Sequence, residues 1–181
     1  RCEEEGIIFV GPTSKHLDMF GDKVKAREQA VLAGIPVIPG SDGPLDTVEE
    51  IRAFGKDHGY PLMIKASLGG GGRGMRVVQT EDELESAFER ARSEAKAAFG
   101  SDEVYVERCI YQPKHIEVQI LGDAEGNLIH LYERDCSIQR RHQKLLEEAP
   151  SPIMTEELRE EMGGSAVKAA EYIGYKSAGT V

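Results

Sequence analysis

The chain has 181 residues, of which 40% are hydrophobic and 30% are charged, so it can bury a core within one or two globular domains. Its net charge of −10 disfavours binding to nucleic acids or anionic membranes, and no long uncharged apolar run predicts a transmembrane helix. Three widely separated cysteines without C-x-x-C spacing indicate free thiols in a reducing, cytoplasmic compartment, with neither a disulfide framework nor a zinc site.

The N-terminal segment is expected to belong to a neighbouring domain. Gly6–Pro12 holds four consecutive apolar residues ended by a Gly-Pro pair, which predicts a short buried strand. A strand needs hydrogen-bonding partners, and the sequence before it offers none. We therefore expect residues 1–22 to be the C-terminal tail of a preceding domain.

Two short helices follow, expected over residues 13–20 and 23–33. Asp22 can accept hydrogen bonds from the backbone N–H groups that open the second helix. Lys23 then lies in the first turn, where the helix dipole disfavours a cation. Its side chain is therefore either solvated or available to an incoming anion.

A subdomain boundary is expected after the second helix. A short strand over residues 35–38 leads into the turn-rich linker Pro39–Pro44. Thr47 and Glu50 then form a capping box for a helix that continues to about His58.

The most distinctive stretch is an apolar run that ends in Lys65, followed by the glycine-rich residues 69–74 and a second β-like run, residues 75–78. Glycine backbone N–H groups can turn inward together and approach an anion closely. The glycines satisfy G-x-G-x-x-G, but neither a helix nor Lys-Ser/Thr follows them, so neither a dinucleotide fingerprint nor a Walker loop is expected. The pattern predicts a hairpin that closes over phosphates, with a plain surface turn or an Arg-Gly contact to nucleic acid as alternatives.

The hairpin is expected to be part of a small α+β lid. Thr80 and Glu83 predict a second capping box, for a helix that runs to Phe99, and residues 104–107 predict another strand. Together these elements predict a lid subdomain over about residues 38–110.

Alternating residues from His115 to Ile120 predict a strand, which the turn 122–127 joins to a second strand, 128–133. Such antiparallel strands usually expose one polar face to water. Here that face carries His115 and Glu117, so a face directed at a ligand is the alternative.

The segment Arg134–Lys144 is basic within an acidic protein. If the chain is extended there, Arg140, His142 and Lys144 share one side. Because like charges this dense repel one another, an anion site is the better interpretation, and a solvated basic loop is the alternative. A helix is expected over residues 155–173.

Four blocks of the sequence carry a resemblance to a known family: Gly21–Lys23, Ile64–Met75, Lys114–Gln119 and Glu133–Lys144. Together they resemble biotin carboxylase, the ATP-grasp component of the biotin-dependent carboxylases. The resemblance covers essentially the whole chain and implies an α/β (α+β) ATP-grasp fragment. It places a partial ATP-grasp domain at residues 23–181, with the lid at about 38–110 and a central subdomain at 111–181.

The branch of the family stays open. Leu17–Gln29 and Ala66–Leu68 look most like pyruvate carboxylase, whereas Leu145–Pro150 looks as much like the acyl-CoA carboxylases, including acetyl-CoA carboxylase. The acyl acceptor of the parent enzyme therefore cannot be chosen from these residues.

The resemblance implies that ATP activates bicarbonate as carboxyphosphate, whose CO2 passes to the ureido nitrogen of biotin on a carrier domain. It assigns bicarbonate binding to Lys144 and places Gln139 in the site nearby. The residues that it assigns to the nucleotide are Lys23 and Lys65 at the phosphates, Gly71 and Gly72 in the lid loop, Glu107, Arg108 and Ile110 at the adenine hinge, and His115 and His142.

Two departures from the family pattern bear on function. Arg108 and Cys109 stand where the family often has a lysine and an aromatic residue. The family's Mg²⁺ carboxylates, catalytic arginine and bicarbonate base are expected beyond Val181, so no metal ligand is predicted within these residues. We therefore expect a piece of a homo-oligomeric enzyme that binds nucleotide but is not catalytically complete. The alternatives are another ATP-grasp carboxylate ligase and a non-catalytic nucleotide-binding or interaction module.

Overall fold

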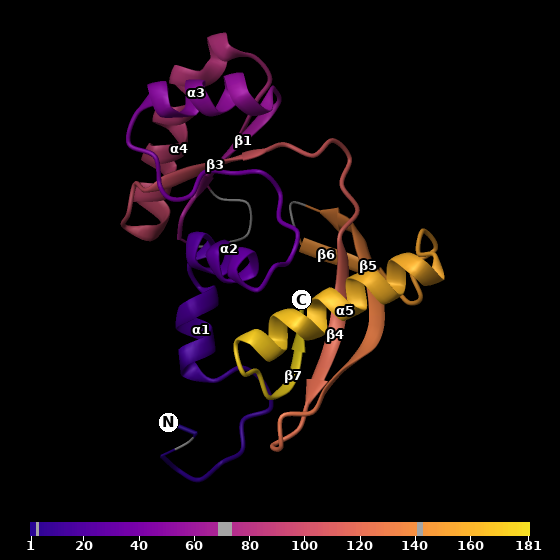
Figure 1. Cartoon of the computed structure of the whole chain (residues 1–181). Helices are drawn as coiled ribbons and strands as arrows, with labels where there is room; N and C mark the ends of the chain where they lie inside the picture. The colour runs from indigo at the N-terminus through magenta and orange to yellow at the C-terminus, as the bar shows by residue number, and fades with distance from the viewer. Residues whose placement is uncertain (3, 69–73, 141–142) are drawn as a thin grey trace. The chain divides into compact units, whose positions relative to one another are not determined.

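The computed structural model describes residues 1–2, 4–68, 74–140 and 143–181. The chain divides into two compact units, each built from more than one segment (Figure 1). Unit 1 consists of Arg1–Met19, Leu32–Ile35 and Lys114–Val181, and unit 2 consists of Phe20–Val31 and Pro36–Pro113. The predicted bounds of the preceding domain, the lid and the central subdomain stay predictions.

Unit 2 contains an antiparallel sheet with the strand order β2-β1-β3. Its strands are β1 (Leu62–Ala66), β2 (Met75–Val78) and β3 (Val104–Arg108). The central strand places Lys65 opposite Met75 on one side and opposite Tyr105 on the other. The predicted strand pair of the hairpin is therefore confirmed, whereas Gly71 and Gly72 lie outside the described residues.

Gly74 lies directly before β2, where the chain enters the second strand of the hairpin. Its φ of +66° is strained for residues with a side chain, and a Cβ there would lie 2.9 Å from the Cβ of Ala66. A glycine is thus required at this position both by backbone conformation and by space.

Helices α3 (Val48–His58) and α4 (Leu84–Phe99) supply the rest of the core of unit 2. Their apolar faces and the sheet share one cluster of buried side chains, as expected for amphipathic helices. The largest fully buried members are Ile51, Leu62, Ile64, Leu84, Val78, Val104 and Val106.

The first capping box is confirmed, but the second is wrong. Thr47 accepts a hydrogen bond from the backbone of Glu50, whose carboxylate bonds back to the backbone N–H of Thr47. Thr80 makes no such bond, because the 3-10 turn η1 (Glu81–Glu83) separates it from the start of α4. The Glu83 carboxylate instead accepts from the backbone N–H of Gln79, at 2.8 Å.

The sheet of unit 1 is also antiparallel, with the order β6-β5-β4-β7. Its strands are β4 (Ile116–Gly122), β5 (Leu128–Arg140), β6 (Gln143–Glu148) and β7 (Ser177–Thr180). Helix α5 (Glu156–Tyr172) lies across it (Figure 1), over a core of Val118, Ile120, Ala166, Ala170 and Tyr175. The predicted alternation of β4 is confirmed, and the predicted strand 128–133 continues as β5 to Arg140. Neither β6 nor β7 was predicted.

The N-terminal helices α1 (Ser14–Phe20) and α2 (Lys23–Leu32) match their predicted positions closely. The strand predicted in Gly6–Pro12 is wrong: those residues are irregular, and Ile8 and Val10 are 90% and 73% exposed. Apolar composition alone did not suffice, because no described segment pairs with this backbone.

Two further predictions of extended structure fail. Residues 35–38 form no strand, because Pro36 lies within them and Pro39 follows them, and the β-bridge nearby is made by Gly40, to Glu107. The basic segment is not one extended run, because Arg140 pairs with Gln143, which places its two ends on separate antiparallel strands.

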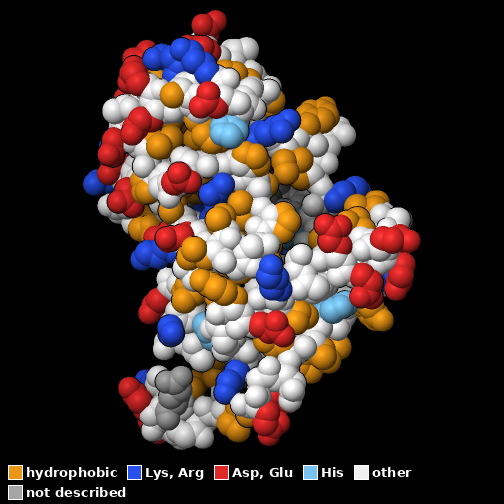
Figure 2. Space-filling view, in the orientation of Figure 1, with side chains coloured by type: hydrophobic (Ala, Val, Ile, Leu, Met, Phe, Trp, Pro, Cys, Tyr) orange, Lys and Arg blue, Asp and Glu red, His pale blue; other side chains and the backbone are white. Residues whose placement is uncertain are grey.

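Acidic, basic and apolar side chains are interspersed over the face of the molecule shown in Figure 2. No helix in the described ranges combines the length and the apolar character that spanning a bilayer requires.

Candidate active site

In unit 2, two lysines approach each other where β1 ends and α2 begins. Asp22 bridges to Leu68, and the backbone N–H of Lys23 donates to the carbonyl of Ser67 at 3.4 Å, so the start of α2 is tied to the end of β1. Asp22 also caps the helix as predicted, accepting from Val24 N at 2.9 Å. These contacts bring the first residue of α2 beside the strand that carries Lys65.

The charges around these lysines are only partly balanced. Lys65 forms an ion pair with Glu107, which lies diagonally from it on the neighbouring strand β3, and both side chains are largely buried. Burial and the neighbouring Lys65 lower the pKa of Lys23, and the Glu107 carboxylate opposes this only in part. Lys23 donates to the carbonyl of Ala66 at 3.5 Å. An anion beside both ammonium groups would relieve their repulsion.

The predicted adenine hinge lies where β3 leaves the sheet. The backbone N–H of Arg108 donates to the carbonyl of Pro39 at 2.8 Å, and that of Cys109 donates to the carbonyl of Pro61 at 3.0 Å. Both N–H groups are therefore used within the fold. Ile110 follows at 50% exposure. The fold thus holds the hinge backbone in place without using the side chain of Arg108 for it, which suits the departure from the family pattern at residues 108–109.

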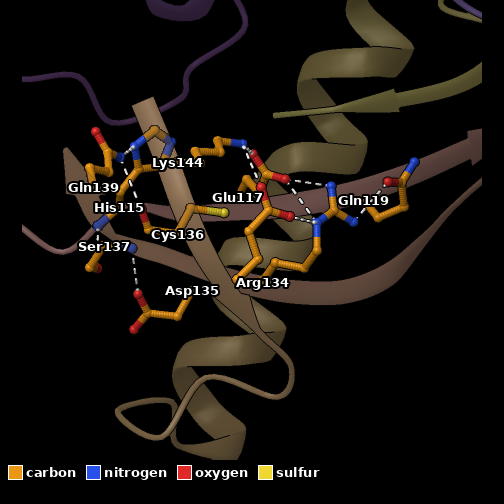
Figure 3. A network of polar contacts seen from close by, with 10 residues as sticks. His115, Glu117, Gln119, Arg134, Asp135, Cys136, Ser137, Gln139 and Lys144 are labelled. Carbon is orange, nitrogen blue, oxygen red and sulfur yellow. Dashed lines mark hydrogen bonds and ion pairs between the residues drawn. The ribbon is translucent and has the colours of Figure 1, made fainter. Parts of the chain in front are cut away.

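In unit 1, the structure brings His115 and Gln139 together (Figure 3). The Gln139 amide donates to Nδ1 of His115 at 2.8 Å and to the carbonyl of Cys136 at 2.9 Å. The backbone N–H of His115 donates to the Ser137 hydroxyl at 2.9 Å. With Nδ1 accepting, the neutral imidazole carries its proton on Nε2, which is left as a donor.

Lys144 lies on β6 and pairs with Glu117 of β4, which also accepts from Arg134 of β5 (Figure 3). Burial raises the pKa of Glu117, but hydrogen bonds from Lys144 and Arg134 outweigh it and hold the pKa below its usual range. The Glu117 carboxylate in turn raises the pKa of Lys144. The Lys144 ammonium is therefore fully charged at neutral pH.

Three residues of this cluster, Glu117, Gln119 and Arg134, were missing from the predicted site. Glu117 and Arg134 are direct cross-strand partners in the β4–β5 hairpin. Oppositely charged residues in that relation attract each other. The turn 122–127 predicted the hairpin, but extending the register from the turn would place Glu117 opposite Glu133. A register shift between Val118 and Ile120 brings Arg134 opposite Glu117 instead, so the turn alone did not predict this pair.

The one group of possible metal ligands found among the described residues does not suit a cation. Glu117, Cys136 and Glu147 have ligand atoms within 4.8 Å of one another. However, the oxygens of Glu117 accept from Arg134 and Lys144, and burial raises the pKa of the Cys136 thiol. Glu107 is likewise paired with Lys65. The described carboxylates at the candidate site therefore do not fit Mg²⁺.

The predicted site residues thus form two groups. Unit 2 places Lys23, Lys65 and Glu107 together. Arg108 ends β3, the strand that carries Glu107, and Ile110 lies two residues beyond it. Unit 1 places His115 beside Gln139, and Gln139 pairs in register with Lys144. His142, like Gly71 and Gly72, lies outside the described residues. The roles of all these residues stay predictions.

Comparison with known proteins identifies the relatives of the chain. Pyruvate carboxylase of Bacillus subtilis is 66% identical over 181 residues, which is the whole of this chain and 16% of that relative. Biotin carboxylase from Campylobacter jejuni, solved as a β-γ-ATP complex, matches with a TM-score of 0.92 and 50% identity over 99% of this chain and 40% of that one.

A third relative is the biotin carboxylase domain of the Hydrogenobacter thermophilus 2-oxoglutarate carboxylase, solved as a dimer with MgADP, ADP and bicarbonate. It matches with a TM-score of 0.91 and 54% identity over 99% of this chain and 40% of that one. The resemblance to biotin carboxylases and the ATP-grasp fold class are confirmed. A family model described as carbamoyl-phosphate synthase L chain, ATP binding domain, matches residues 22–181, and the chain belongs to that family.

Proposed function

We propose that this chain provides the nucleotide lid and part of the bicarbonate site of a biotin carboxylase that carboxylates biotin at the expense of ATP. The observation that carries the proposal is the pair of ammonium groups at Lys23 and Lys65, one of which has its pKa lowered by burial and by the other. Two lysines are placed together in this way when a polyanion is to be bound between them.

Unit 2 would bind ATP. Lys23 and Lys65 would contact its phosphates from the start of α2 and from β1, with the glycine-rich residues 69–73 between β1 and β2. The end of β3 and the residues after it would contact adenine through the backbone around Glu107, Arg108 and Ile110. The relatives solved with ADP or an ATP analogue support this assignment.

Unit 1 would supply the groups for bicarbonate. Lys144 carries a full positive charge. His115 presents an Nε2 donor, held by Gln139. These donors would attract bicarbonate and stabilise the charge that develops as its oxygen attacks the γ-phosphorus. The phosphoryl group would leave ADP and join that oxygen, giving carboxyphosphate. Its C–O bond would then break to give CO2 and phosphate, and the CO2 would join a biotin nitrogen as the proton of that nitrogen passes to the released phosphate.

The remaining parts of the parent enzyme are proposed by family relationship. The chain spans 16% of one pyruvate carboxylase and 40% of two solved biotin carboxylases, so metal ligands and further catalytic groups would come from elsewhere in the parent protein. We include biotin on a carrier domain as partner and a homodimer as assembly, since one relative was solved as a dimer. The free cysteines suit a cytoplasmic location.

The test is ATP cleavage by the full-length protein that contains this segment, assayed with and without bicarbonate and biotin. We expect cleavage to require bicarbonate and to be accelerated by biotin. Cleavage that another carboxylic acid supports and bicarbonate does not would point to a different ATP-grasp ligase. ATP binding without cleavage under any of these conditions would leave only a nucleotide-binding module.

A further inference from the structure

The cluster around Lys144 contains an arginine that none of the predicted roles uses. Arg134 lies on β5, between Glu117 of β4 and Lys144 of β6 in strand order. Its Nε donates to the Glu117 carboxylate at 2.8 Å, and Figure 3 shows Glu117 between Lys144 and Arg134. Glu117 is only 8% exposed, so it accepts from two cations with little help from water.

The charges explain why a second cation is needed. Glu117 on its own would neutralise Lys144 and leave no net charge to attract bicarbonate. Because Arg134 also neutralises Glu117, part of the positive charge of Lys144 remains available to an anion. Glu147 lies further off, at 3.7 Å from Arg134 and 3.8 Å from Lys144, and is 42% exposed, so water screens it more strongly.

Arg134 is also held in orientation from its far side. Its Nη1 donates to the side-chain Oε1 of Gln119 at 2.9 Å, and Nε2 of the same Gln119 side chain donates to the backbone carbonyl of Gly179 at 2.8 Å. The guanidinium is therefore held by two residues of β4, Glu117 and Gln119, and Gln119 connects it to β7. A planar group held at both ends fixes the carboxylate that it binds.

We infer that Arg134 is a positioning residue for Lys144, acting through Glu117, with Gln119 as the anchor that orients it. The inference rests on the proposed function, because it takes Lys144 to bind bicarbonate. Arg134 itself would not contact bicarbonate; it would set the place and the net charge of the lysine that does.

The same unit offers a matched control. Arg159 of α5 binds the buried carboxylate of Glu133, with Nε and Nη2 at 2.9 and 3.0 Å from its two oxygens. Glu133 is adjacent to Arg134 on β5, but its side chain also accepts from the backbone of Ser151 and makes no contact with Lys144. Replacing Arg159 thus breaks a comparable buried pair without touching the bicarbonate cluster.

The experiment compares four variants of the full-length protein, Arg134→Gln, Arg134→Lys, Gln119→Met and Arg159→Gln, by bicarbonate-dependent ATP cleavage. We expect Arg134→Gln to raise the KM for bicarbonate about tenfold, on the scale of one charge-assisted hydrogen bond, while the KM for ATP stays within about twofold. Arg134→Lys should show a smaller rise in the KM for bicarbonate, since lysine keeps the charge but lacks the planar, forked set of donors of the guanidinium. Gln119→Met should give a smaller rise still, and Arg159→Gln should lower the Tm without a selective change for bicarbonate.

The outcomes separate the inference from the function on which it rests. If the unsubstituted protein shows no bicarbonate-dependent cleavage, the proposed function and the inference both fail. If it does, and Arg134→Gln raises both KM values equally or does no more than Arg159→Gln, the inference alone is wrong. Should Arg134→Gln not fold, normal bicarbonate KM values for Arg134→Lys and Gln119→Met together would also overturn it.

Discussion

Each unit contains one lysine paired with a carboxylate from another strand of its own sheet, and the two pairs differ in what surrounds them. Beside Lys65 and Glu107 stands a second lysine, Lys23, whose pKa is lowered by burial and by Lys65. Beside Lys144 and Glu117 the second cation is bonded to the same carboxylate, and the pKa of Lys144 is raised.

Under the proposed function, this difference would correspond to two kinds of anion site. An excess of partly buried positive charge is stabilised by a ligand with several negative charges, such as the phosphates of ATP. A lysine whose charge is secured by its neighbours suits a small, singly charged anion such as bicarbonate, because the ligand then needs to contribute little to keep the site charged. Substitutions in the two clusters should therefore affect different substrates.

The largest effect is expected from Lys65→Ala in the full-length protein. The change removes one cation and leaves Glu107 without its partner, and an unpaired carboxylate would repel phosphate. We expect ATP binding to weaken by about 2 to 3 kcal/mol, the scale of a lost charge-assisted contact, measured by calorimetric titration. Glu107→Gln in the same protein should restore part of the loss. An unchanged affinity would remove Lys65 from the site.

The second prediction concerns the other substrate, bicarbonate. Lys144→Ala should lower kcat/KM for bicarbonate by a factor that corresponds to about 1.5 to 2 kcal/mol of lost transition-state stabilisation, since one charged donor is lost. The ATP affinity measured by calorimetry should stay nearly unchanged. A larger loss for ATP than for bicarbonate would reassign Lys144 to the nucleotide and would erase the contrast between the clusters.

The third prediction concerns the backbone that carries Lys65. Gly74→Ala should lower the free energy of unfolding by about 1 to 2 kcal/mol, because its positive φ and the contact with Ala66 both oppose a side chain. Gly100→Ala is the control: its φ of +79° is in the left-handed region, but nothing lies within 4 Å of the added Cβ. Equal losses of stability in chemical denaturation would show that the contact with Ala66 costs nothing and that the hairpin adapts.

Local signals in the sequence predicted most of the elements that carry the two clusters, but not β6, the strand that carries Lys144. The hairpin strands, the Asp22 cap and the alternation of β4 depend on neighbouring residues, so their patterns were readable. The ion pair between Glu117 and Arg134 depends on strand register, which the positions of the turns constrain but do not state. It is the kind of contact that a search along the sequence misses.

The failures have the opposite cause. Gly6–Pro12 had the apolar composition of a strand, and Thr80 stood at the right spacing from Glu83 for a capping box. Neither pattern shows the feature that decides whether the structure forms. A strand needs a second backbone segment to pair with, and the capping box needs α4 to begin directly after Thr80, where the 3-10 turn η1 lies instead. β7 was missed because Ser177–Thr180 is short and has no alternating apolar residues, and pairing with β4 makes it a strand.

The smallest effect tests the charge state of Lys23. Because burial and Lys65 lower its pKa in the free protein, this lysine loses its charge at a lower pH than an ordinary lysine does. ATP affinity should therefore fall as the pH rises through that lowered pKa, and bound phosphate, which favours the charged form, should move the fall to higher pH. Lys23→Arg keeps its charge over this range, so the fall in affinity should disappear from calorimetric titrations in that variant. If the fall persists unchanged with arginine at this position, another group titrates, and the contrast drawn between Lys23 and Lys144 is wrong.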